Sequence, residues 1–352
     1  VEGRTKIPSF AVPSNGIGTY VAGAGQALRL YAERFITKAP DKRKNAVNIL
    51  GATPLDFSVN GCVQSMARRL EEAGFTLQSV FAMGSSFDSV DEAGAAEANL
   101  VISSVGLPAA KYLQAQFGTP YVIGAPFGDF FSPYVFDALR ESIRTGAPAD
   151  VLGTFAPDAP DTIILGESVT AKSLAAALAV GYGIRARVIC PVEAPGGVLG
   201  ACDMQLEDEE EIEKALRGAK RVIADPLYKP IVPKTSEFYA LPHEAFSGRI
   251  YRKQIPNLAE LPPPNRPSRP GPKLRQRKKR PSRRRTSSPS PTTTTTSCRS
   301  PKTRSASPCA TSCRCRRFFA CSLTRRKSWS ASRRRACPPH KIAFSLSCIQ
   351  KF

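Results

Sequence analysis

The sequence predicts an α/β fold with two Rossmann-like, doubly wound parallel-sheet domains, which follow the remnant of a first domain and precede a disordered basic tail. Short apolar runs alternate with segments that carry apolar side chains at helical spacing, and this alternation is typical of parallel strands with helices on both faces. Glycines such as Gly74 and Gly118 follow the helical segments, as C-caps do. The expected boundaries are 1–44 for the remnant, 45–150 and 160–256 for the second and third domains, and 261–352 for the tail.

The elements follow in order along the chain. In the remnant we expect a strand at Ile7–Val12 and a helix at Tyr20–Thr37. In the second domain we expect strands at Val47–Leu50, Thr76–Met83, Asn99–Ser103 and Pro120–Ile123, and helices at Val63–Ala73, Ser89–Glu97 and Leu107–Phe117. After a link at Gly146–Pro160, we expect strands at Thr162–Leu165, Ala186–Cys190 and Arg221–Ala224, and helices at Ala171–Val180 and Asp208–Leu216.

Charge and cysteine separate the tail from the rest of the chain. Residues 1–260 contain all 29 Asp and Glu and 25 of the 50 Lys and Arg, a net charge of 25 − 29 = −4, so the tail carries the other 25 positive charges. Only Cys62, Cys190 and Cys202 precede the tail. Three widely spaced cysteines indicate buried thiols in a reducing compartment, and we expect a cytoplasmic protein. No apolar run is long enough to span a bilayer, so no membrane partner is expected.

Two interpretations account for the tail. Its 25 positive charges could bind nucleic acid with a steep salt dependence, although aromatic residues for base stacking are few. Alternatively, the abrupt loss of every acidic residue and of every periodic pattern near residue 260 indicates translation out of frame. The second interpretation is favoured, so nucleic acid is an unlikely partner. The chain also begins at Val1 rather than Met, which suggests a fragment.

Small residues follow the predicted strands, where ligands of open parallel sheets bind. Each of these loops could simply make a tight turn, but together they favour a shared crevice lined by backbone and helix N-termini. The chain contains no phosphate-binding G-x-x-x-x-G-K-[ST] loop, so no nucleotide site is expected, and it has no G-x-S-x-G elbow or paired histidines. The loops are Gly51–Thr53, Gly84–Ser86, Ser103–Gly106, Gly124–Pro126 and Gly166–Ser168.

Several strings resemble the nitrogenase component 1-type oxidoreductase family. In the second domain these are VNILGATPLDFSVNG, RRLEEAGF, ANLVISS and AAKYLQAQFGTPYVIGAPFG; in the third they are TIILGESVTAKSLAAAL, KRVIADPLYKPIVP and LPHEAFSGR. Residues 7–37 are similar to the end of the family's first domain. The resemblance implies a subunit that accepts electrons from an ATP-hydrolysing iron–sulfur reductase and pairs with a second component 1 subunit in a homo- or hetero-dimer. It also implies an iron–sulfur cluster, whose ligands lie mostly in first-domain sequence that this chain lacks, so the fragment is expected to be inactive.

The resemblance also points to site residues. Ser103 matches a cysteine that binds the active-site metal cluster in nitrogenase, and a hydroxyl is a poor ligand for soft metals. His243 matches the family's histidine ligand if one residue is skipped, although a lone histidine is more often structural. Glu167 falls in the family's third-domain cavity loop, either as a proton donor or as a helix-start acid. We therefore expect Glu167 and His243 to be catalytic, Ser103, Ser104, Gly166 and Ser168 to bind a cofactor, and no residue to bind a metal directly.

Whether the chain is an enzyme is left open by the sequence. The family also includes reductases of tetrapyrrole rings and of small organosulfur compounds, and members that assemble a cofactor without turnover. The main hypothesis is therefore a component 1-like reductase subunit. The alternatives are a non-catalytic scaffold for cofactor assembly with the same fold and a nucleic-acid binder that acts through its tail.

Overall fold

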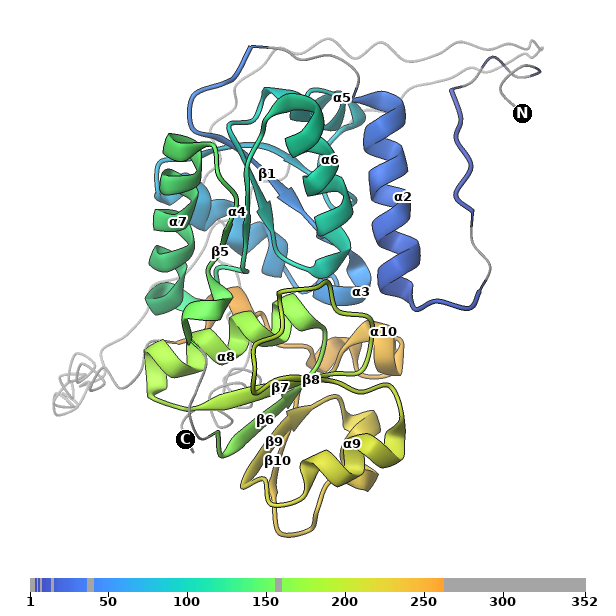
Figure 1. The fold of residues 1–352 in the computed structure, drawn as a ribbon, viewed down its shortest axis with the longest axis vertical. Helices are drawn as coiled ribbons and strands as arrows, with labels where there is room; N and C mark the ends of the chain where they lie inside the picture. Colours follow the sequence, from blue (N-terminus) through green and yellow to red (C-terminus); the bar gives the residue numbers. More distant parts are fainter. Residues whose placement is uncertain are drawn as a thin grey trace, which may run out of the picture. The chain divides into compact units, whose positions relative to one another are not determined.

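The structure is a computed structural model that describes residues 4, 6, 8–13, 16–36, 41–155 and 160–262. These residues form two five-stranded sheets in which every strand pair is parallel (Figure 1). Parallel sheets need both faces covered, and helices lie on both sides of each sheet. The predicted α/β fold with two parallel-sheet domains is therefore confirmed.

The first sheet has the order β2-β1-β3-β4-β5, and the inner strand β1 is fully buried. Buried Asn48 of β1 donates from Nδ2 to Asn99 Oδ1 of β3 (2.8 Å) and accepts from Ser79 Oγ of β2 (2.7 Å), so the three strands are also joined by side chains. Helix α2, Tyr20–Phe35, packs on α6. The strands are β1 Ala46–Leu50, β2 Thr76–Val80, β3 Ala98–Val101, β4 Tyr121–Ile123 and β5 Ala149–Asp150; the helices are α3 Pro54–Phe57, α4 Cys62–Glu72, α5 Phe87–Asp91, α6 Leu107–Phe117 and α7 Gly128–Thr145, with 3₁₀ turns at Ala93–Ala95, Ser104–Gly106 and Leu152–Phe155.

The second sheet has the order β10-β9-β6-β7-β8. Helix α8, Ser168–Tyr182, is buried along most of its length because it packs on the second sheet and also contacts α7 of the second domain. Its Ser173 accepts a hydrogen bond from Ala125 N (2.8 Å), which ties the helix to the end of β4. The strands are β6 Thr162–Leu165, β7 Ala186–Cys190, β8 Met204–Gln205, β9 Arg221–Ala224 and β10 Glu237–Ala240, and the other elements are α9 Glu209–Leu216 and the 3₁₀ helix Pro226–Ile231.

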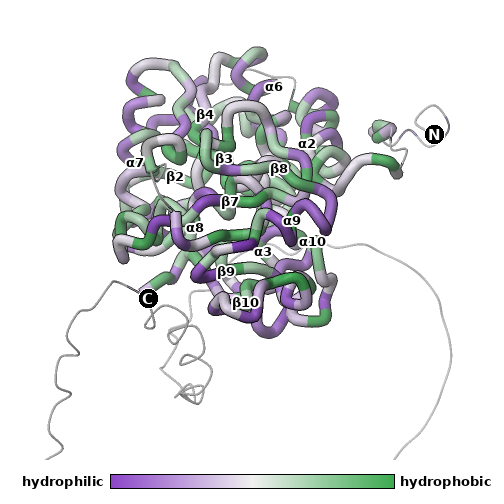
Figure 2. The backbone as a smooth tube through the Cα atoms, turned by 60° about the horizontal axis from the view of Figure 1, so that its bottom comes forward, coloured by the Kyte–Doolittle hydropathy of each residue, from purple (hydrophilic) through white to green (hydrophobic). Residues whose placement is uncertain are grey.

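The outer helices are buried on one side only. Helix α9 buries Ile212 and Leu216 and exposes its acidic first turn. The tube in Figure 2 accordingly changes between hydrophilic and hydrophobic along α7 and α9. This one-sided pattern is what an amphipathic surface helix requires.

After β10 the chain returns to the second domain. This return segment, residues 241–262, contains α10 Glu244–Ser247 and 3₁₀ turns at Arg252–Gln254 and Leu258–Glu260, and it contacts α3 and α4. Asn60 Nδ2 donates to Pro256 O (2.9 Å), and Asn257 Nδ2 donates to Ser65 Oγ (3.0 Å). The end of the third domain is therefore fastened to the second.

Several expected elements are wrong in detail. No strand forms over the described residues of Ile7–Val12, where Pro8 and Pro13 limit pairing. The helix expected at Ser89–Glu97 is instead α5 followed by a 3₁₀ turn, and the link Gly146–Pro160 contains the edge strand β5. Helix α7 and strands β8 and β10 were not expected.

The predicted tail lies outside the described residues, apart from Leu261 and Pro262. Among the helices of the described residues, none is both long and apolar enough to cross a membrane.

Candidate functional site

A pocket of about 50 Å³ lies where the second and third domains meet. A volume of this size holds a few water molecules or one small organic group. Its walls come from α3, the end of β6, the start of α8 and the return segment, and most of them are apolar. The polar residues in its lining include Asp56, Asn60, Glu167 and His243.

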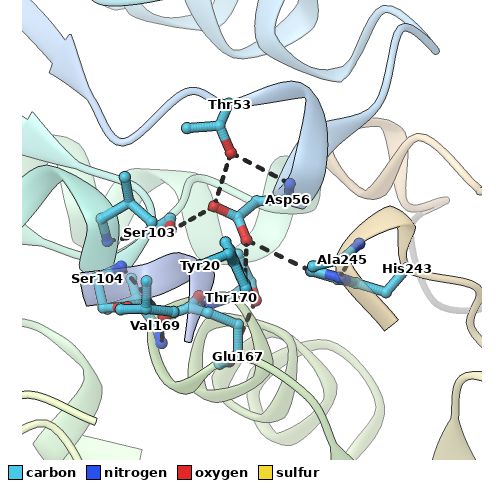
Figure 3. Close-up of polar contacts among 12 residues, drawn as sticks. Tyr20, Thr53, Asp56, Ser103, Ser104, Glu167, Val169, Thr170, His243 and Ala245 are labelled. Atoms are coloured by element: carbon cyan, nitrogen blue, oxygen red, sulfur yellow. Dashed lines mark hydrogen bonds and ion pairs between the residues drawn. The ribbon is translucent and has the colours of Figure 1, made fainter. Parts of the chain in front are cut away.

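Asp56 is the centre of a buried polar network beside this pocket (Figure 3). Thr53 caps α3, and Asp56 lies three residues later, which places its carboxylate back over the helix start. The carboxylate is fully buried. Its Oδ1 accepts from Tyr20 Oη (2.6 Å), and its Oδ2 accepts from Ser103 Oγ (2.7 Å) and Thr53 Oγ1 (3.1 Å). Three hydroxyl groups thus stabilise one carboxylate that has left water.

Tyr20 comes from α2, in the predicted first-domain remnant, and reaches the network from another part of the chain. Burial, together with the neighbouring Asp56 carboxylate, raises the pKa of Tyr20 well above its ordinary value. The phenol therefore keeps its proton and remains a hydrogen-bond donor to Asp56.

His243 caps α10, and its two ring nitrogens differ. Nδ1 accepts from Ala245 N (3.3 Å), while Nε2 lies 3.5 Å from Asp56 Oδ1 and has no hydrogen-bond partner among the described residues. The backbone is held by Asp225, whose Oδ2 accepts from His243 N (2.7 Å). The ring stacks on Phe246 with centroids 4.5 Å apart. These contacts fix the ring with Nε2 close to Asp56.

Glu167 caps α8 and also joins the two domains. Its Oε1 accepts from Val169 N (3.0 Å) and from Ser104 N of the second domain (3.1 Å), and its Oε2 accepts from Thr170 N (2.9 Å). The side chain is fully buried. The geometry matches a helix-start acid, and any proton donation from Glu167 would first have to break these contacts.

The remaining expected residues lie around these two carboxylates. Ser103 Oγ bonds Asp56, and Ser168 Oγ donates to Glu167 Oε1 (3.1 Å). Ser104 is buried, and its Oγ has no partner among the described residues. Gly166 lines the pocket beside Glu167. The structure therefore brings the six expected residues together at the domain junction, around the carboxylates of Asp56 and Glu167.

Sequence reasoning missed Asp56 and Tyr20. Thr53 and Asp56 have the spacing of a capping box, a signal that could have placed an acid at the start of α3. Nothing in the sequence relates Asp56 to Tyr20 or His243, because these residues meet only in the folded protein.

The thiols of the described residues do not fit an iron–sulfur cluster. Cys62 and Cys190 lie in buried apolar clusters, where burial raises the pKa of Cys62 to about 11 and that of Cys190 to about 12. Cys190 Sγ already donates to Val192 O (3.3 Å). Within the described ranges, no three His, Cys, Asp or Glu side chains are grouped to hold a metal ion.

Comparisons with known proteins point to one family. Residues 1–152 match the family described as nitrogenase component 1 type oxidoreductase. The light-independent protochlorophyllide reductase of Prosthecochloris aestuarii has a subunit that is 37% identical over 84 residues, which cover 24% of this chain and 16% of that protein. The same subunit from Nostoc punctiforme is 35% identical over 86 residues, or 24% of this chain and 17% of that protein. The matched segments thus span less than a fifth of these relatives.

Solved structures add a weaker likeness. A structure described as nitrogenase Cp1 at pH 6.5 aligns with a TM-score of 0.42 and 11% identity, over 69% of this chain and 63% of that one. A second, nitrogenase Cp1 at pH 5, aligns with a TM-score of 0.36 and 16% identity, over 55% of this chain and 44% of that one.

Proposed function

Through residues 1–152 the chain belongs to the nitrogenase component 1 type oxidoreductase family, and we propose that it is the substrate-holding part of a component 1-like reductase subunit. In this proposal the complete subunit accepts electrons from an ATP-hydrolysing iron–sulfur reductase. It also pairs with a second component 1 subunit, and the complex works in the cytoplasm. By itself, the chain is expected to be inactive.

The observation that carries this proposal is the pocket at the junction of the two sheets. Loops that follow the carboxyl ends of β1, β3 and β6 meet there, and open parallel sheets bind ligands at this edge. Ser103 and Glu167 follow β3 and β6. Glu167 Oε1 accepts from Ser104 N across the junction, and Ser103 Oγ donates to Asp56 within the second domain. A substrate held in this pocket would be enclosed by both domains.

The cluster that the family implies would be supplied by polypeptide other than the described residues, since no three His, Cys, Asp or Glu side chains among these are grouped to hold a metal. The role proposed for the chain's own residues is to enclose the substrate and to orient it by hydrogen bonds. Glu167 and His243 are proposed as the polar groups that face it, and Ser103, Ser104, Gly166 and Ser168 as their supports.

Reconstitution tests the proposal. The chain would be fused behind the first domain of a protochlorophyllide-reducing relative and combined with the second subunit, the reductase and ATP. We expect ATP-dependent loss of protochlorophyllide absorbance, the compound named in the relatives' activity. The His243→Phe variant of the fusion is expected to slow turnover by roughly tenfold or more, the scale of losing one positioned donor.

A complex that assembles with its partners and binds the pigment but never turns over would contradict a reductase role. Such a result would favour the non-catalytic scaffold instead. Dithionite is the electron source of this assay. A control without ATP therefore separates turnover that the reductase drives from direct chemical reduction by dithionite.

A further inference from the structure

We propose that residues 248–256, which we call the lid segment, form a movable wall of the pocket and open it about Gly248 while the two domains stay packed. The inference rests on the proposed function for its purpose, because the opening would admit the substrate. The opening itself belongs to this chain and can be measured without a substrate. Figure 1 shows α10, which leads into the lid segment, beside α3 at the junction of the domains.

The first step is which wall of the pocket is able to move. Phe127, Ile164 and Glu167 line it from the two domains and are fully buried, so moving them would separate sheets from their helices. Ile255 and Pro256 line it from the lid segment, whose outer side faces water: Ile250, for example, is 79% exposed. The lid segment is therefore a thin wall between the pocket and the solvent.

The second step is how the lid segment is attached. Its backbone–backbone hydrogen bonds, such as that from Gln254 N to Tyr251 O (2.8 Å), all stay inside the segment. In the part of the chain that the structure describes, no such bond joins it to another element. Segments with few bonds to their surroundings open locally at a lower free energy than the domain core.

The third step is the hinge. Gly248 has φ +62° and ψ −143°, a conformation that side chains rarely adopt, although a Cβ atom there would meet nothing within 4 Å. The chain is fixed on either side of the segment, because Ser247 Oγ donates to Asp225 Oδ2 (2.7 Å) and Asn257 Nδ2 donates to Ser65 Oγ (3.0 Å). A flexible glycine next to a fixed helix is a suitable hinge.

The fourth step is what holds the lid segment closed. Arg252 donates from Nε and Nη2 to the Glu244 carboxylate of α10, and Asn60 Nδ2 donates to Pro256 O (2.9 Å). The Arg252 side chain is 30% exposed, so water is available to replace its partner when the segment lifts. Exchange of such bonds for bonds to water costs little. These side chains act as catches that release without unfolding a domain.

The experiment uses two thiols of the full chain. Cys62 is buried and lines the pocket, whereas Cys190 is buried in a separate cluster with Val21 and Val192, away from the pocket lining. The native chain would be treated with N-ethylmaleimide, and peptide mass spectrometry would follow each cysteine separately. Opening of the lid segment exposes only Cys62. We therefore expect Cys62 to react at least about tenfold faster than Cys190.

Two variants release the catches. Asn60→Asp keeps the oxygen that accepts from Cys62 N (3.0 Å) but loses the donor to Pro256 O. Arg252→Gln removes the positive charge and the paired N–H groups. Each should raise the labelling rate of Cys62 roughly three- to tenfold, the scale of one lost hydrogen bond, and leave that of Cys190 unchanged.

Arg144→Gln is the matched control for Arg252→Gln. Arg144 also donates from Nε and Nη2 to one carboxylate, that of Glu141, but both residues lie on α7. The substitution removes the same kind of ion pair without touching the lid segment. It should therefore change neither labelling rate.

Equal labelling rates for Cys62 and Cys190 in the wild type would overturn the inference, because the pocket would then open only when the domains do. An unchanged Cys62 rate in folded Asn60→Asp and Arg252→Gln chains would overturn it too, as would an equal rise in Arg144→Gln. If the lid variants do not fold, the wild-type comparison still decides. A reconstituted complex without turnover, beside faster labelling of Cys62, would reject the proposed function and leave this inference standing.

Discussion

At Gly106 the loop after β3 approaches the end of β1 more closely than any side chain permits. A Cβ atom there would lie 2.5 Å from the carbonyl carbon of Leu50 and 2.6 Å from Gly51 N, both of them backbone atoms. We predict that Gly106→Ala lowers the free energy of unfolding by about 1–3 kcal/mol, because strands rather than a flexible side chain must move. Urea denaturation of the purified chain would measure the change.

Gly23 provides the matched control for this substitution. It lies inside α2, and a Cβ there would meet nothing within 4 Å. Gly23→Ala should therefore stabilise the chain by about 0.5–1 kcal/mol, the difference in helix propensity. Equal effects of the two substitutions would contradict the close approach of Gly106 to the backbone of Leu50 and Gly51.

Single residues also show where sequence reasoning reaches its limit. The sequence suggested that Glu167 is either a proton donor or a helix-start acid, and the structure gives it the geometry of a helix-start acid. Tyr20, Asp56 and His243 lie on three different elements, so their proximity depends on how the domains pack. Local patterns contain no information about such long-range contacts. The catalytic and binding roles suggested for the six expected residues stay predictions.

At the scale of elements, a strong local sequence signal was sufficient to predict where a helix begins and ends. Helix α6 has the predicted bounds Leu107–Phe117, because Gly118 ends it in a left-handed conformation. Helix α7 was missed, since Pro133 lies inside it and argues against a helix. Strands β5 and β8 have only two residues each, and their existence depends on a neighbouring strand rather than on their own sequence.

The return segment is an element whose attachment can be tested at one side chain. Ser65 of α4 is buried, accepts from Asn257 Nδ2 (3.0 Å) and donates to Glu260 Oε1 (2.8 Å). We predict that Ser65→Ala costs about 1–2 kcal/mol of unfolding free energy, because it leaves two partners without their hydrogen bond. Arg68→Ala, which removes exposed ion pairs with Glu260 and Glu72, should cost at most about 0.5 kcal/mol.

The pH dependence of the Ser65→Ala effect provides a further check. The hydrogen bond from Ser65, followed by that from Arg68, lowers the pKa of Glu260. A carboxyl with a lowered folded-state pKa contributes stability above its ordinary value of 4.5, and this contribution is lost as the pH falls through the folded value. The gap between wild type and variant should therefore narrow in acid. A gap that widens below pH 4.5 would contradict the assigned contact.

At the scale of the whole molecule, thiols and phenols whose pKa is raised by burial predict that the protein loses stability in alkali. Burial raises the pKa of Cys62 to about 11 and those of Cys190, Tyr182 and Tyr228 to about 12. The unfolded chain loses these protons at ordinary values of 9 to 10, before the folded chain does. The free energy of unfolding should therefore fall steadily above about pH 9, and urea midpoints between pH 8 and 11 would measure it.

Cys190→Ala separates this effect from general alkaline damage. It removes one of the groups of raised pKa, so its urea midpoint should fall less steeply with pH than that of the wild type. Parallel slopes for the two proteins would show that Cys190 does not contribute. Neutral-pH stability should drop as well, because Ala leaves a small cavity in the buried cluster around Val105 and Val192.

Two truncations show how much of the chain the folded unit needs. Deleting 263–352 keeps the whole return segment, including buried Ala259 and Leu261 and the hydrogen bond from Tyr182 Oη to Pro262 O. The urea midpoint should then be unchanged. Deleting 251–352 also removes the wall that Ile255, Pro256 and Leu258 give the pocket, and should cost several kcal/mol, with about 2 kcal/mol from buried Leu261 alone.

The shorter of the two deletions also removes the basic residues after 262 and leaves 25 basic against 29 acidic side chains. Any binding of DNA at low salt should disappear with it, and DNA binding that survives this deletion would have to come from the folded domains.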